Sequence, residues 1–228
     1  KLFLILELNQ NLGLEMKYPI LYSFRRCPYA MRARMALSYS GITYEHREIL
    51  LKKRPKDLYD ISQKGTVPVL RIKESNILDE SLDIMKWALK TSDNDNWYKE
   101  DITNQDTFIS GNDNNFKSKL DKYKYHIRNP ELSFEEHRIN VIEFLKKYDS
   151  ILKTQKYLIN DKISLADIAI FPFIRQCANV DLLWFKPSFP NLDKWLENFK
   201  NSNLFKTIMT KFPIWEKENN KIIINKSA

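Results

Sequence analysis

The sequence predicts an α/β domain followed by an all-α helical-bundle domain, and three observations support this. Short apolar runs alternate with helical patterns up to about residue 90. A stretch rich in Ser, Asp and Asn then interrupts the pattern. Beyond it, apolar residues recur only at helical spacing. The predicted divisions are an N-terminal extension at residues 1–17, domains at 18–91 and 97–215, and a tail at 216–228.

The elements of the first domain are expected in the order β-α-β-(α)-β-β-α. Residues 20–24 form a short apolar run of the kind found in a buried parallel strand. Pro28 suits the first turn of the helix that follows, and Gly41 suits its end. The remaining expected elements are a strand at 44–49, a weak helix within 52–62, a turn and strand at 65–72, a strand at 77–78 and a helix opened by residues 80–81.

Capping boxes mark two helix starts in the second domain, at Ser133–Glu136 and Ser164–Asp167. The second box opens an apolar stretch in which Pro172 predicts a kink or a break in the helix. Apolar spacing predicts helices over residues 109–123, 134–152, 168–174 and 192–199. The tail is polar except for three isoleucines at 222–224, and we expect it to be loosely attached.

Composition excludes several function classes. Hydrophobic residues make up 43% of the 228 residues and charged residues 29%, which is typical of a globular protein. Only 4 glycines are present, and neither a G-x-G-x-x-G nor a Walker-type phosphate loop occurs. The net charge of +8 is dispersed, because the longest basic run is Lys52–Arg54. We therefore expect a solvated basic surface rather than a nucleic-acid site, and an anionic small substrate would also suit it.

The two cysteines, Cys27 and Cys177, are too few for a disulfide scaffold and favour a reducing compartment. No apolar run has the length of a membrane span, and the apolar run at residues 2–6 is too short for a signal peptide. We therefore expect a cytoplasmic protein with no membrane partner. The three histidines lack metal-ligand spacing with either cysteine, so no metal is expected.

Cys27 is the candidate nucleophile. It follows the first strand and precedes Pro28, at a helix N-terminus where free N–H groups favour an anion. Arg25 and Arg26 add positive charge, so the thiolate is expected to be favoured. The motif is C-x-x-A, ending at Ala30, and it holds no second cysteine. A mixed disulfide on Cys27 must then be resolved by an external thiol, which indicates glutathione.

Val67-Pro68 is a second candidate feature, because X-Pro bonds are the usual place for cis peptides. A cis bond would turn the backbone of Val67 outward, where an extended peptide could pair with it. A trans proline opening a strand is the alternative, and these two residues alone would favour it.

Four segments together resemble a known family: Arg26–Tyr29, Ala33–Met35, Thr66–Leu70 and Asp79–Ile84. Residues 18–90 resemble the thioredoxin-fold glutathione-binding domain of glutathione transferases, and residues 100–215 resemble the helical domain that follows it. The similarity is greatest to the cysteine-type branch, which comprises omega-class transferases and two-domain bacterial glutaredoxins. The resemblance implies a glutathione transferase architecture and a thioltransferase or dehydroascorbate reductase that uses glutathione as co-substrate.

The resemblance also implies roles for individual residues. Cys27 would form the mixed disulfide, and Val67, preceding cis Pro68, would pair with the cysteinyl unit of glutathione. Glu80 would take the γ-glutamyl ammonium group, and Ser81 the carboxylate. The remaining implied contact is that of Lys52 with the glycyl carboxylate, for which Lys53 is a close competitor.

Alternatives remain open at this point. The enzyme could instead conjugate glutathione to small electrophiles, or the chain could be a non-catalytic binding module of the same fold. Many glutathione transferases activate glutathione with a Tyr or Ser hydroxyl. Tyr22 and Ser23, on the first strand, could be mistaken for that residue, but Tyr22 is interpreted as a core residue. A homodimer is usual in the family, whereas two-domain glutaredoxins are monomers. Cys177 is interpreted as structural, and Arg34 as a surface or structural residue rather than a catalytic one.

Overall fold

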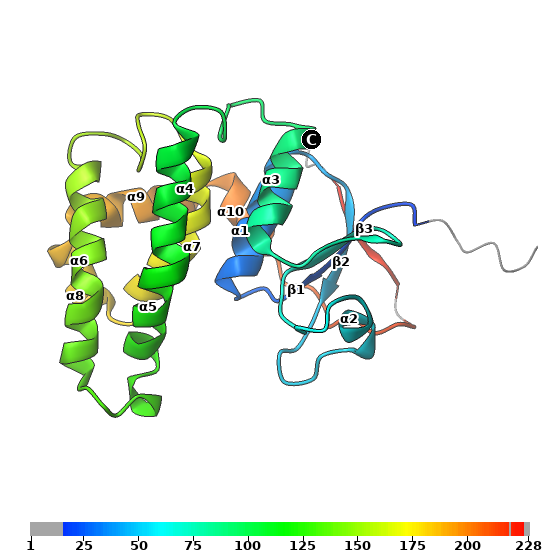
Figure 1. Cartoon of the computed structure of the whole chain (residues 1–228), viewed down its shortest axis with the longest axis horizontal. Helices are drawn as coiled ribbons and strands as arrows, with labels where there is room; N and C mark the ends of the chain where they lie inside the picture. The colour runs from blue at the N-terminus through cyan, green and yellow to red at the C-terminus, as the bar shows by residue number, and fades with distance from the viewer. Residues whose placement is uncertain (1–15, 219, 226–228) are drawn as a thin grey trace, which may run out of the picture.

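The computed structural model describes residues 16–218 and 220–225. An α/β layer lies beside a bundle of helices, with α1 and α3 between the sheet and the bundle (Figure 1). The fold is therefore the predicted one, an α/β domain with a helical C-terminal domain. Of the predicted extension at residues 1–17, all but Met16 and Lys17 lie outside the described residues.

The sheet has five strands in the order β4-β3-β1-β2-β5. Strand β1 pairs parallel with β2 and antiparallel with β3, and β4 pairs antiparallel with β3. Successive side chains of a strand point to opposite faces of the sheet. Leu21 therefore joins the core with α1 and α3, whereas Ile20 and Tyr22 pack with Leu58 of α2 on the other face. The strands are β1 Ile20–Ser23, β2 Tyr44–Glu48, β3 Val69–Lys73, β4 Asn76–Leu78 and β5 Ile222–Ile224.

Helix α1 begins at Pro28, as predicted, since proline at the first helical position lacks only an N–H that would have no partner. Gly41 follows its end with φ 67°, a left-handed conformation that favours glycine. The helices of the α/β domain are α1 Pro28–Tyr39, α2 Lys56–Ile61 and α3 Ser81–Thr91.

The C-terminal segment differs from the expectation of a loose tail. Strand β5 pairs antiparallel with β2, with Tyr44 opposite Ile224 and His46 opposite Ile222. Before it, the backbone N–H of Trp215 donates to the carbonyl oxygen of Glu48 at 2.7 Å. The expectation was wrong because a run of β-branched residues is well suited to the unpaired edge of a sheet. Local polarity did not reveal that such an edge was available.

The helical domain confirms both capping boxes, at the starts of α6 and α7. Helix α7 continues through Pro172 and is not broken there. The single helix expected over 109–123 is instead two α-helices joined by a π-helical segment, η1. The elements are α4 Ile102–Gly111, η1 Asn112–Phe116, α5 Lys117–Lys124, η2 His126–Arg128, α6 Phe134–Leu152, α7 Leu165–Ala178, α8 Leu182–Ser188, α9 Pro190–Asn201 and α10 Asn203–Ile208.

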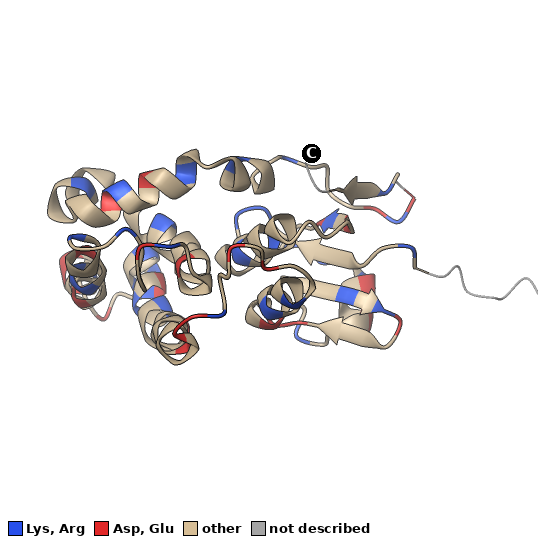
Figure 2. Cartoon of the chain, turned by 90° about the horizontal axis from the view of Figure 1, so that it is seen from above, with Lys and Arg blue, Asp and Glu red and all other residues tan. Residues whose placement is uncertain are grey.

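One apolar core crosses the boundary between the domains. It includes Leu21 and Met35 from the α/β domain together with Phe171 and Ile174 of α7. Lys and Arg are scattered among Asp and Glu over both domains (Figure 2). Among the described residues, no helix is long and apolar enough to cross a membrane. In the same part of the chain, no group of three or more His, Cys, Asp and Glu side chains is arranged to hold a metal ion.

Candidate functional site

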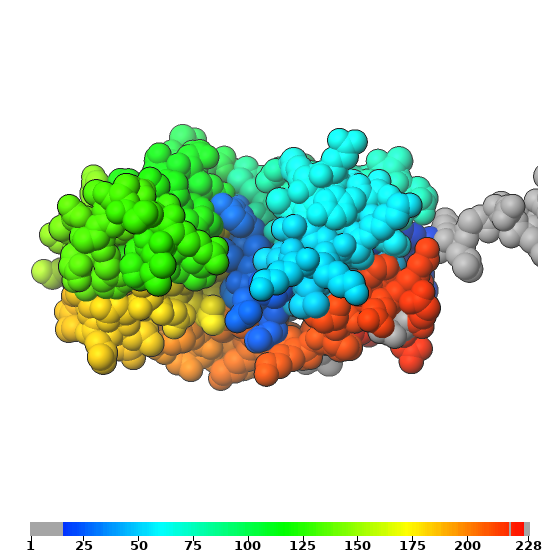
Figure 3. Space-filling view, turned by 90° about the horizontal axis from the view of Figure 1, so that it is seen from below, coloured from blue at the N-terminus to red at the C-terminus, as the bar shows by residue number. Residues whose placement is uncertain are grey.

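Cys27 lies in the turn between β1 and α1, as the residue immediately before the helix. Its side chain is half-buried. The sulfur lies 3.5 Å from the carbonyl oxygen of Val67, to which the thiol donates a weak hydrogen bond. In the view from below, the blue segment near the start of α1 forms the floor of a hollow between the cyan residues and the green and yellow helices (Figure 3). The cysteine turn therefore lies where the two domains meet.

Burial raises the pKa of the Cys27 thiol above its ordinary value. The backbone N–H groups of Ala30 and Tyr29 lower that pKa, as do the charges of Arg34 and Lys117, but desolvation outweighs them. The expected lowering of the pKa is therefore wrong for the unliganded chain. The donors at the helix start are present as predicted, and burial, which the local motif did not reveal, reverses the balance.

A buried arginine and a buried glutamate hold the cysteine turn in place. Arg34 Nη2 donates to the carbonyl oxygen of Arg25 at 2.8 Å, and its Nη1 donates to the Ser23 hydroxyl. Its Nε donates to the carbonyl oxygen of Ile208 in α10 at 3.2 Å, which ties the turn to the helical domain. From the opposite side, Glu48 Oε1 accepts the backbone N–H of Arg25 at 2.6 Å. Arg34 is thus a structural residue, as interpreted from the sequence.

The raised pKa gives a direct test on the unliganded chain. In a Cys177→Ala variant, the rate of alkylation of Cys27 by iodoacetamide is expected to rise about tenfold per pH unit through neutrality, because only the thiolate reacts. The midpoint is expected above the ordinary thiol value of about 8.5. Mass spectrometry of the alkylated chain measures this rate. A rate that is already constant below neutral pH would contradict the burial argument.

A cavity of about 570 Å³ lies beside the cysteine. It brings together four of the predicted site residues, Val67, Pro68, Glu80 and Ser81, and the Val67–Pro68 bond is cis. Lys52 and Lys53 are exposed on the segment after β2 and do not line the cavity. The other lining residues are Tyr29, Arg32, Lys64, Thr66, Asp79, Leu82, Asp83, Asp113 and Asn114.

Sequence reasoning missed the arginine at the base of this cavity. Arg32 is buried in α1, and its Nε donates to the Ser81 hydroxyl at 3.0 Å. Its two Nη atoms donate to the carboxylate of Asp113 at 2.9 and 2.7 Å. Asp113 lies on η1, and such π-helical turns are frequent at functional sites. The sequence does show Arg32 as a charged residue between apolar neighbours in α1, which is a signal for a buried charge. It does not show the partner, because Asp113 is 81 residues away.

The cavity has carboxylates at one side and positively polarised groups at the other. At one side, Lys64 Nζ donates to Glu80 at 2.6 Å and to Asp79 at 3.2 Å, so two carboxylates face a position already occupied by an ammonium group. At the other side, the N-terminus of α3 begins at Ser81, next to the Arg32 guanidinium. The arrangement can bind a zwitterion, with its ammonium group near Glu80 and its carboxylate near Ser81.

A second cavity, of about 400 Å³, also adjoins the cysteine turn and shares no lining residue with the first. Arg26 and Pro28, which flank Cys27 in the sequence, form part of its wall. The remaining lining residues are Met31, Lys124, His126, Phe134, Pro172, Arg175, Gln176, Asn179 and Val180. This cavity therefore lies between the α/β domain and helices of the second domain, within reach of groups bound at the cysteine turn.

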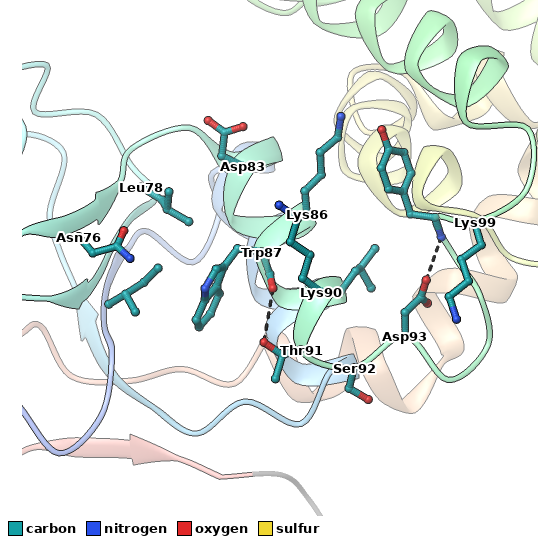
Figure 4. A pocket seen from close by; sticks show the side chains of 13 residues that line it. Asn76, Leu78, Asp83, Lys86, Trp87, Lys90, Thr91, Ser92, Asp93 and Lys99 are labelled. Carbon is teal, nitrogen blue, oxygen red and sulfur yellow. Dashed lines mark hydrogen bonds between the residues drawn. The ribbon is translucent and has the colours of Figure 1, made fainter.

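A third cavity, of about 700 Å³, lies along α3 and the segment after it (Figure 4). Two of its charged groups already have partners, since Lys86 pairs with Asp106 and Asp93 accepts the backbone N–H groups of Trp97 and Tyr98. No residue of the cysteine turn lines it. We therefore place the candidate site in the two cavities that adjoin Cys27.

Comparison with known proteins gives matches in both domains. The family described as "Glutathione S-transferase, N-terminal domain" matches residues 21–96, and the family described as "Glutathione S-transferase, C-terminal domain" matches residues 115–203. Glutathione S-transferase omega-1 of Mus musculus is 38% identical over 61 residues, which cover 27% of this chain and 25% of that protein. The matched stretch thus spans about a quarter of the length of this relative and of the omega-1 protein of Rattus norvegicus.

Solved structures agree on the fold. A glutathione transferase family member from Pseudomonas fluorescens, with two glutathione molecules bound, has a TM-score of 0.74 at 16% identity and covers 85% of this chain and 92% of its own. A glutathione transferase from Phanerochaete chrysosporium in complex with oxidized glutathione has a TM-score of 0.73 at 19% identity, with coverages of 85% and 95%. With both domains matched and the architecture shared, the chain belongs to the glutathione S-transferase superfamily.

Proposed function

We propose that the chain is a glutathione-dependent thiol transferase or reductase that acts through a mixed disulfide of Cys27 with glutathione. One observation carries the proposal: the Cys27 sulfur lies 3.5 Å from the Val67 carbonyl, beside the cavity that Glu80 and Ser81 line. A nucleophile and a zwitterion-binding cavity thus adjoin each other. Disulfides and dehydroascorbate-like compounds are the expected acceptors.

Each part of glutathione has a partner of suitable chemistry in this arrangement. The backbone of Val67, before Pro68, pairs with the cysteinyl unit and keeps its sulfur near Cys27. The γ-glutamyl ammonium group replaces the Lys64 ammonium beside Glu80, and its carboxylate takes the N-terminus of α3 at Ser81. Arg32 supports that end, because its Nε already donates to the Ser81 hydroxyl.

The glycyl carboxylate also needs a cationic partner, which the residues named above do not supply. Lys52 is our proposed partner for it, and Lys53 is its close competitor. Both side chains are exposed, and a lysine carries its ammonium group on a long flexible stem that suits a carboxylate partner.

The reaction proceeds by two thiol–disulfide exchanges. The Cys27 thiolate attacks the glutathione sulfur of a mixed disulfide, an S–S bond forms between them, and the original S–S bond breaks with its electron pair going to the leaving thiolate. The thiolate of a second glutathione then attacks the mixed disulfide on Cys27. Glutathione disulfide leaves and the Cys27 thiolate is restored. Glutathione is the reductant, and no metal is used.

Conjugation of glutathione to an electrophile is the second reaction to weigh. In that case a hydroxyl group would activate the glutathione thiol. Tyr22, on β1, is the residue that could be taken for such an activating group. Its side chain is buried, its hydroxyl oxygen accepts a hydrogen bond from Arg47, and burial raises its pKa. No feature of Tyr22 therefore favours conjugation over thiol exchange at Cys27.

The glutathione cavity is tested by binding. We expect calorimetry to detect glutathione binding to the chain and Glu80→Gln to weaken it about tenfold or more, since the amide no longer neutralises the ammonium group. Glu74→Gln is the matched control, because Glu74 is exposed, pairs with Arg71 and lies outside the cavity. Equal affinity of both variants would contradict the assigned role of Glu80. Absence of binding to the unaltered chain would favour a non-catalytic module.

The setting of the reaction follows from its chemistry. A free nucleophilic thiol resolved by glutathione requires a reducing compartment, and we propose the cytoplasm. A homodimer stays a prediction from the family, and sedimentation of the chain would measure its assembly state.

A further inference from the structure

The second cavity beside Cys27 contains positive charges that have no acidic partner. Arg26, Lys124 and Arg175 line it, and none of them forms an ion pair with any residue in the described ranges. No Asp or Glu is among its lining residues. The glutathione cavity differs, since its cations Arg32 and Lys64 are both paired with carboxylates. The two cavities that adjoin the cysteine turn therefore have different electrostatic character.

The unpaired cations lie against aromatic rings. The guanidinium of Arg175 is 5.4 Å from the ring centre of Phe205, and that of Arg26 is 5.6 Å from Phe24. Arg175 is half-buried, and burial together with the neighbouring charge of Arg25 lowers the pKa of its guanidinium from the ordinary value. Water screens the charge of a half-buried arginine such as Arg175 less than that of an exposed lysine. An anionic ligand therefore binds more strongly to Arg175, which also lies near the charge of Arg25.

Two buried polar atoms on residues that line this cavity also have no partner. His126 Nδ1 and Gln176 Oε1 form no hydrogen bond within the described residues. An imidazole ring nitrogen can donate to an oxygen anion, and the amide of Gln176 can pair with a polar group of a ligand. The wall of this cavity is therefore polar as well as positively charged.

We infer that the second cavity binds the leaving half of a glutathione mixed disulfide and selects halves that carry a carboxylate. This inference rests on the proposed function, since it names the substrate class of the same site. In the first exchange, the S–S bond of the substrate breaks and its electron pair goes to the leaving sulfur. The leaving half then carries two negative charges, on sulfur and on carboxylate, beside Arg26 and Arg175. The charges of the cavity favour that product over a neutral or cationic one.

Three mixed disulfides of glutathione, similar in size, test the charge selection. Their leaving halves are 3-mercaptopropionate, 2-mercaptoethanol and cysteamine, which end in a carboxylate, a hydroxyl and an ammonium group. We expect kcat/KM of the unaltered chain to be about tenfold or more higher for the carboxylate than for the ammonium substrate, with a smaller ratio at high salt. Arg175→Gln is expected to lower the carboxylate rate most and so reduce this ratio.

Controls separate a charge effect from a folding effect. Arg175→Lys keeps the charge and should retain most of the preference, whereas Lys99→Gln, in the separate cavity along α3, should change neither the rates nor the ratio. Equal kcat/KM for the three substrates, or preference for the ammonium substrate, would overturn the inference and leave the proposed function intact.

A binding measurement keeps the inference testable without turnover. The thioethers S-(2-carboxyethyl)glutathione and S-(2-aminoethyl)glutathione carry the same two charges on substituents of similar size. Calorimetry is expected to show tighter binding of the carboxyethyl compound, and a weaker difference in Arg175→Gln. Absence of turnover with all three disulfides would refute thiol transfer, while the relative affinities of the thioethers would still support or overturn the charge selection.

Discussion

Replacing Cys27 by serine is expected to reduce the glutathione-dependent reduction of a mixed disulfide to the uncatalysed rate. The serine hydroxyl is almost isosteric with the thiol, so the hydrogen bond to the Val67 carbonyl and the start of α1 are preserved. A hydroxyl does not form the mixed disulfide on which the exchange depends, and removal of a covalent nucleophile typically costs several orders of magnitude in rate. Coupled oxidation of NADPH by glutathione reductase measures the loss.

Cys177→Ala is the control for this variant. Cys177 is buried in α7, and burial raises the pKa of its thiol, so it is expected to behave as a small apolar side chain. The control should retain its activity. An undiminished rate in Cys27→Ser or Cys27→Ala would refute the assignment. Conjugation of an aryl halide that persists in Cys27→Ser, without disulfide reduction in the unaltered chain, would support the conjugating alternative instead.

Replacing Asp167 by alanine is expected to cause the largest loss of stability. Its buried carboxylate accepts the backbone N–H of Ser164 at 3.0 Å and that of Leu158 at 2.8 Å, the Ser164 hydroxyl at 2.6 Å and the indole N–H of Trp195 at 3.0 Å. Alanine would leave these donors buried without partners. We expect the free energy of unfolding to fall by about 3–5 kcal/mol, measured by urea denaturation.

Two further variants show whether burial is the cause. Asp167→Asn keeps one acceptor oxygen and should cost less than alanine, because the donors of Leu158 and Trp195, which both bind Oδ1, can keep a partner. Glu136→Ala removes the equivalent side chain of the exposed capping box of α6 and should cost only a small part of that loss. Equal effects of the exposed and the buried replacements would show that burial does not set the stability of the box.

Features with a local cause could be predicted from the sequence. Proline at the first position of α1 and the two capping boxes determine where helices begin, so those boundaries were confirmed. That Val67, Glu80 and Ser81 share one site was implied by the resemblance to glutathione transferases, not by a local pattern, and the three residues do line one cavity.

Features that depend on distant partners could not be predicted in the same way. The pairing of Arg32 with Asp113 needs both domains in place, and so does the burial that raises the pKa of the Cys27 thiol. The π-helical segment that carries Asp113 interrupts a pattern that reads as one regular helix. Pairing of the isoleucines at 222–224 with β2 depends on a free sheet edge, which no nearby residue indicates.

The place of β5 has a consequence for how firmly the two halves of the molecule are joined. The chain leaves the α/β domain after α3, builds the helical bundle and returns after α10 to pair with β2. Two covalent crossings, rather than one hinge, therefore span the boundary where the second cavity lies. Moving one domain away from the other would pull on both crossings at once. If the proposed function holds, we expect selection among acceptors to depend on the charge and shape of a preformed opening rather than on closure around the ligand.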